Sequence, residues 1–82
     1  MNRIKEFGGA VRKRRLARGF TQEQLAELAN LHVNSISFVE RGLVPPALDT
    51  ICLIADALGV KVSELVYDME EAAQKSGLIE DS

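Results

Sequence analysis

The chain has 82 residues, of which 46% are hydrophobic, and its net charge at neutral pH is −2. This length fits one domain over residues 1–82, and the hydrophobic fraction excludes a wholly disordered chain. The sequence lacks the roughly 20-residue apolar run of a membrane helix and the apolar core of a secretion signal, and its single cysteine excludes an internal disulfide, so we expect a cytoplasmic protein without membrane contact.

The charges are unevenly distributed along the chain. Residues 1–44 hold eight Lys or Arg against four acidic residues, whereas residues 45–82 hold two against eight. A basic first half and an acidic second half suit a protein with one side facing nucleic acid and the other facing solvent. Two mixed, solvated surfaces are the alternative, which charge alone does not exclude.

The first predicted helix covers residues 4 to about 17. Gly8 and Gly9 weaken it by about 1 kcal/mol each relative to alanine, and Gly19 ends it. Its expected apolar face consists of Ile4, Phe7, Ala10 and Val11. The basic residues Arg12, Lys13 and Arg14 are expected to be solvated.

Residues 21–42 predict two short helices joined by a tight turn. Thr21 is a favourable N-cap, Gln24 completes a capping box, and Asn30 ends the first helix because asparagine tolerates a left-handed backbone. The side chains expected to be buried in the first helix are Leu25, Ala26, Leu28 and Ala29.

The second helix of this pair follows Leu31 and His32. It should bury Ile36 and Val39 and end at Gly42. The positions expected to face away from the core are Val33, Asn34, Ser35, Ser37 and Phe38. Two short helices with such a turn form a helix-turn-helix, whose second helix can enter the major groove of DNA.

A proline-containing link and a further helix come next. Pro45 and Pro46 interrupt the helical pattern, and residues 48–58 then form a helix that Gly59 ends. Its predicted buried stripe consists of Leu48, Ile51, Ile54, Ala55 and Leu58. Cys52 is interpreted as a small packing residue.

The last predicted helix is capped by Ser63 and begins at Glu64. It carries more apolar residues than a solvated terminal helix of a small domain needs, namely Leu65, Val66, Tyr67 and Met69. The acidic tail at about 76–82 is expected to fray.

Three segments together resemble a known family. They are Thr-Gln-Glu-Gln-Leu-Ala from residue 21, Ile-Ser-Phe-Val-Glu-Arg-Gly from residue 36 and Ala-Asp-Ala-Leu-Gly-Val from residue 55. The chain is similar over residues 7 to about 66 to the lambda-repressor-like (Cro/cI-type, XRE family) helix-turn-helix regulators, and in particular to small stand-alone members such as restriction–modification controller proteins. The resemblance implies an all-α, five-helix domain that regulates transcription as a homodimer on a pseudo-palindromic operator.

The resemblance also implies two structural roles. Arg15 and Glu40 occupy positions that form an ion pair in the family, which would hold the second motif helix against the first helix of the domain. The last helix, from about residue 63, would provide a dimer interface made of Leu53, Val66, Tyr67 and Met69. Docking of these residues onto the monomer's own core is the alternative.

Double-stranded DNA is the expected partner. Gln22 corresponds to a family position that faces a phosphate, Asn34 can bond adenine, and Arg41 is expected to meet a phosphate. His32 could touch DNA or serve only as a cap. The expected DNA-binding set is Thr21, Gln22, His32, Val33, Asn34, Ser35, Ser37, Phe38 and Arg41. The alternative is structural: Val33 and Phe38 would belong to the core, and Asn34 and Ser35 would be merely solvated.

The sequence offers no arrangement of residues typical of an enzyme, a metal site, a cofactor or a small-molecule effector site. The uncharged link at residues 43–47 departs from the family, in which Lys, Arg or Asn often grips the DNA backbone there. It predicts modest DNA affinity or a contact with protein. The rival hypothesis is therefore an antitoxin or protein-interaction module built on a helix-turn-helix scaffold.

Overall fold

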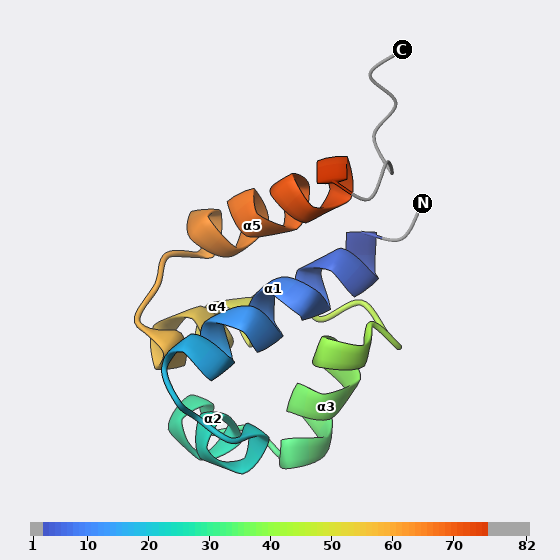
Figure 1. The fold of residues 1–82 in the computed structure, drawn as a ribbon. Helices are drawn as coiled ribbons and strands as arrows, with labels where there is room; N and C mark the ends of the chain where they lie inside the picture. The colour runs from blue at the N-terminus through green and yellow to red at the C-terminus, as the bar shows by residue number, and fades with distance from the viewer. Residues whose placement is uncertain (1–2, 76–82) are drawn as a thin grey trace.

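The computed structural model describes residues 3–75, and within them it contains five α-helices and no β-strand (Figure 1). The helices are α1 (Arg3–Ala17), α2 (Gln22–Ala29), α3 (Val33–Arg41), α4 (Leu48–Leu58) and α5 (Val62–Lys75). The predicted all-α, five-helix architecture is confirmed. The predicted frayed tail lies outside the described residues.

Helix α1 is the axis of the domain. It packs against α5 on one side and against α3 on another, while α2 packs against both α3 and α4 (Figure 1). The core between these helices is formed by Phe7, Val11, Leu25, Ala26, Ile36, Val39, Ile54, Ala55, Leu58 and Leu65. None of the helices within residues 3–75 combines the length and the apolar character needed to cross a membrane.

The helix-turn-helix has the predicted local signals. Thr21 accepts a hydrogen bond from the backbone N–H of Gln24, whose side chain accepts one from the backbone N–H of Thr21, so the capping box is complete. Asn30 ends α2 with φ 59°, and Gly42 ends α3 with φ 67°. These caps set the lengths of both short helices.

Three expected core residues are exposed instead. Leu28 is 58% exposed because the buried side of α2 runs through Leu25 and Ala29, and Leu28 lies past its edge. Leu48 is 71% exposed because it is the first residue of α4, where side chains tilt back beyond the helix end. Cys52 is also exposed, so its interpretation as a packing residue was wrong.

The start of α5 also differs from the prediction. The helix begins at Val62, and the Glu64 carboxylate accepts a hydrogen bond of 2.8 Å from the backbone N–H of Lys61. This contact gives a hydrogen-bond acceptor to the backbone N–H of the residue just before the helix, as the glutamate of a capping box does. Ser63 therefore lies inside the first turn and is not the cap.

Gly8 marks the closest approach of α1 to α3. A β-carbon at this position would lie 2.7 Å from the Glu40 carbonyl oxygen and closer still to that of Val39. The backbones of the two helices thus meet where only glycine fits. The neighbouring Gly9 faces open space.

Candidate nucleic-acid interface

A buried ion pair holds α3 against α1. Arg15 Nε lies 2.7 Å from Glu40 Oε2, and Arg15 Nη2 donates to Glu40 Oε1 at 3.0 Å. The two side chains are only 9% and 2% exposed. Hydrogen bonding to Glu40 raises the pKa of the Arg15 guanidinium above its ordinary value, against the opposing effect of burial. The arginine also donates to the carbonyl of Phe20, at 2.8 Å, just before α2.

Gln22 extends this network to α2. Its Nε2 donates to Glu40 Oε1 at 3.0 Å, so the start of α2 is tied to the end of α3. Gln22 thus has a partner within the protein, and its contact with a DNA phosphate stays a prediction. With Arg15, Glu40 and the Phe20 carbonyl, the Gln22 amide fixes how α2 and α3 sit on α1.

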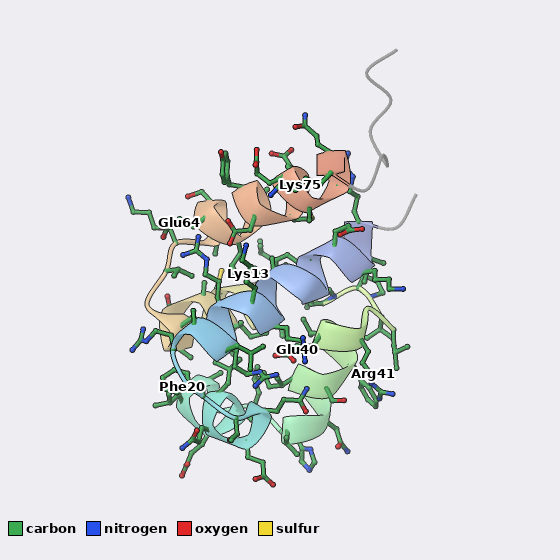
Figure 2. The ribbon with its side chains drawn as sticks, viewed as in Figure 1. Lys13, Phe20, Glu40, Arg41, Glu64 and Lys75 are labelled. Carbon is green, nitrogen blue, oxygen red and sulfur yellow. The ribbon has the colours of Figure 1, made fainter. Side chains whose placement is uncertain are left out.

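The outer side of α3 is accessible. Asn34 and Arg41 are exposed, and Phe38 is 41% exposed, with the Arg41 guanidinium 5.7 Å from its ring centre. Figure 2 shows Glu40 on the side of α3 that faces α1 and Arg41 on the other side. Ser35 and Ser37 are half-buried.

Val33 differs from the other outward positions. It is half-buried and packs against the hydrophobic core, so the expectation that it faces away from the core was wrong. As the first residue of α3 it lies close to the turn that leads from α2, where the core still reaches it. Its contact with DNA stays a prediction.

His32 is the N-cap of α3. Its ring Nδ1 accepts a hydrogen bond of 3.0 Å from the backbone N–H of Asn34, and the side chain is otherwise exposed. The capping role left open by the sequence is therefore present in the structure.

An ion pair that the sequence did not indicate joins α1 to α5. Arg14 Nε lies 2.7 Å from Asp68 Oδ2, and Nη2 lies 3.3 Å from Oδ1. Hydrogen bonding to Asp68 raises the pKa of the Arg14 guanidinium above its ordinary value. The expectation that Arg14 is simply solvated was wrong, because α5 brings its carboxylate back along α1.

The four residues expected at the dimer interface do not all line the same hollow, and their role in an interface stays a prediction. Val66 and Met69 line an apolar groove together with Pro46, Ile51 and residues at the start of α1. Tyr67 lines a separate hollow with acidic residues of α5. Leu53 lines neither, although it is exposed on α4.

We searched residues 3–75 for groups suited to catalysis or metal binding. Cys52 is a free, exposed thiol, and the Nδ1 of His32 is occupied as a cap. Within residues 3–75, no three His, Cys, Asp or Glu side chains lie together as metal ligands would. What the face around α3 offers is hydrogen bonding, apolar contact and the charge of Arg41.

Comparisons with known proteins agree with this arrangement. A family model described as helix-turn-helix matches residues 11–65. The immunity repressor protein of Bacillus phage phi105 is 41% identical over 59 residues, which cover 72% of this chain and 41% of the repressor. The control protein C.BamHI of Bacillus amyloliquefaciens is 43% identical over 61 residues, which cover 73% of this chain and 75% of that protein. The chain thus spans less than half of the repressor's length.

A solved structure extends the likeness to the fold. The restriction–modification controller protein C.AhdI of Aeromonas hydrophila is 37% identical and superposes with a TM-score of 0.74, covering 76% of this chain and 94% of its own. The match spans most of both chains, as expected for proteins of one family. This chain belongs to the XRE-type helix-turn-helix family of DNA-binding transcription regulators.

Proposed function

We propose that this protein is a cytoplasmic, sequence-specific transcription regulator that binds a pseudo-palindromic DNA operator as a homodimer and has no enzymatic activity. The observation that supports it best is the state of α3. Its inner side is locked by the Arg15–Glu40 pair, while Asn34, Phe38 and Arg41 are exposed on its outer side. A rigidly held helix with an open face is what reading a DNA groove requires.

The side chains divide by the part of DNA that they suit. Thr21 and Gln22 stand at the N-terminus of α2, whose dipole favours a phosphate, and Arg41 adds a charged donor. Asn34 can bond N6 and N7 of adenine together. The remaining contacts to base edges come from Val33, Ser35, Ser37 and Phe38, and the apolar members among them suit thymine methyl groups, so we expect an A/T-biased half-site.

The groove lined by Val66 and Met69 is the proposed centre of the dimer. It is apolar and open to solvent, and both residues lie on α5, away from α3. To bind two half-sites, a two-fold pairing through α5 has to present two copies of α3 about 34 Å apart, one turn of DNA. Leu53 and Tyr67 do not line this groove, so they would contribute only at the edge of the interface.

Selection of bound sites from random DNA tests the proposal. Two variants then distinguish contacts with the phosphates from contacts with the bases. Asn34→Ala should relax the preference at one position of each half-site by about 1–3 kcal/mol. Gln22→Ala should weaken binding to all sequences alike, and its unfolding must be measured too because Gln22 also holds Glu40. Unmodified protein that prefers no sequence over random DNA would refute the regulator.

A second candidate function rests on the link between α3 and α4. Leu43 and Val44 in the link are 56% and 49% exposed, where a DNA-gripping cation would be expected, and Leu48 at the start of α4 is 71% exposed. These exposed apolar side chains favour an antitoxin or another protein-interaction module. Substituting Leu43 and Val44 by serine should leave DNA binding unchanged if the link serves a partner protein. A loss of DNA binding would instead assign the link to the operator complex.

A further inference from the structure

His32 combines two features that are usually found on different residues. Its Nδ1 caps α3 by accepting the backbone N–H of Asn34 at 3.0 Å. The His32 side chain is also exposed at the N-terminal end of α3. In our proposed function, this end of the helix enters the major groove of DNA. Among the described residues, none forms a hydrogen bond with the other ring nitrogen of His32, Nε2.

The cap determines where the imidazole proton lies. A nitrogen that accepts a hydrogen bond cannot carry a proton at the same time, so the neutral ring has its hydrogen on Nε2. The His32 ring thus accepts a hydrogen bond from a backbone N–H of α3 through Nδ1, and its Nε2–H is a second donor on the exposed side chain. The positive end of the helix dipole and the bond at Nδ1 both polarise this Nε2–H toward an anionic acceptor.

We propose that His32 acts as a hydrogen-bond relay, capping α3 through Nδ1 while donating Nε2–H to a phosphate oxygen of the operator. The proposal rests on the proposed function, since it concerns the same DNA complex. A phosphate is favoured over a base as the acceptor because His32 stands at the N-terminus of α3, and a helix N-terminus attracts negative charge. Capping and DNA contact, which the sequence presented as alternatives, then occur together.

Two neutral variants separate the two halves of the relay. His32→Asn keeps an acceptor near the position of Nδ1 and is a good cap, but its amide does not reach the position of Nε2. It should retain the denaturation midpoint and lose about tenfold in DNA affinity, because the lost bond is to a charged acceptor. His32→Gln places an N–H near Nε2 without a favourable cap. It should lower the denaturation midpoint and retain DNA affinity.

The pattern of the loss identifies the acceptor. For a phosphate contact, His32→Asn should weaken binding to the selected site and to its single-base changes equally. The salt dependence should keep its slope, because a neutral donor releases no counterion. A loss confined to one base position, or no loss at all, would overturn the proposal.

The tautomer can be measured without DNA. Nitrogen NMR of the free protein should show the His32 hydrogen on Nε2, and a hydrogen on Nδ1 would overturn the relay whatever the DNA results. If unmodified protein binds no preferred sequence, the proposed function fails. If it binds one and His32→Asn binds equally well, only the relay fails.

Discussion

Two neighbouring arginines of α1 make similar ion pairs in different surroundings. Arg15 and Glu40 are 9% and 2% exposed, whereas Arg14 and Asp68 are 34% and 22% exposed. Each pair has a shorter contact of 2.7 Å, so the difference lies in burial and not in distance. Arg15 faces the α3 side of α1, and Arg14 faces the α5 side.

The two sides of α1 are suited to different tasks. On the α3 side, helices meet backbone to backbone at Gly8, and Gln22 and the Phe20 carbonyl each add a hydrogen bond to the ion pair. On the α5 side, a charged hollow and an apolar groove stay open. The domain thus fixes the helix that would read DNA and leaves unfilled surface where a second copy would bind.

The largest expected effect is from breaking the buried pair. Glu40→Ala leaves the Arg15 charge buried without its partner, and we expect it to lower the free energy of unfolding by about 3–5 kcal/mol. Glu27→Ala, on the exposed side of α2, is the matched control and should change it by less than about 0.5 kcal/mol. Urea denaturation of the two variants measures the difference.

The pH dependence of this loss follows from the arginine. Because the pKa of Arg15 is raised in the folded state, its contribution is complete below the ordinary arginine pKa and is lost only as the pH rises through the raised value. The effect of Glu40→Ala should therefore be constant from neutral to moderately alkaline pH. Equal denaturation midpoints for the Glu40 and Glu27 variants would show that the pair is immaterial.

The next effect tests the contact between backbones. Gly8→Ala would place a methyl group against two carbonyl oxygens of α3, and we expect a loss of about 3 kcal/mol as the helices separate. Gly9→Ala meets nothing within 4 Å and should stabilise α1 by about 1 kcal/mol. Thermal unfolding should move in opposite directions for the two variants. A shift in the same direction would mean that α1 and α3 do not touch at Gly8.

The features predictable from the sequence are those made by near neighbours in the chain. Thr21 with Gln24, Asn30 and Gly42 act within one helical turn, and the structure has each of them as expected. The start of α5 was mispredicted because Ser63 is a favourable cap residue, whereas Glu64 caps from inside the helix. Local chemistry permits both, and the structure contains the hydrogen bond from Lys61 to Glu64.

Contacts between distant segments were largely hidden. Arg14 and Arg15 are alike in sequence, and only the family resemblance singled out Arg15. The partner of Arg14 lies 54 residues away, a separation that no periodicity reveals. Gly8 and Gly9 likewise looked equally harmful to α1, since the nearness of α3 is a tertiary fact. At the candidate site, helical spacing placed Asn34 outward correctly, but it could not show that the core reaches Val33.

A smaller effect concerns the open side of α1. Val66→Glu places a charge in the apolar groove, and we expect the dimer dissociation constant to rise about 30-fold, equivalent to about 2 kcal/mol, with the fold retained. Tyr67→Glu alters the separate hollow and should have a lesser effect. Sedimentation measures both. Unmodified protein that is monomeric at high micromolar concentration would contradict the interface, and a greater effect at Tyr67 would move its centre.

The smallest effect is expected at the half-exposed pair. Asp68→Ala should lower the free energy of unfolding by only about 0.2–1 kcal/mol, because both side chains keep contact with water in the folded state. Asp68 lies on the same helix as Val66, so a change in dimerisation could be mistaken for a change in folding. The measurement is therefore made on the Val66→Glu background, where the protein is expected to be monomeric.

A double-mutant cycle with Arg14→Ala isolates the pair from its surroundings. At about 1 M salt the Debye length falls to about 3 Å, so the coupling between Arg14 and Asp68 should vanish. The coupling between Arg15 and Glu40 should persist at the same salt concentration, because solvent ions do not reach side chains that are 9% and 2% exposed. Equal salt sensitivity of the two couplings would show that burial does not distinguish the two sides of α1, and the rigid placement of α3 would then need another cause.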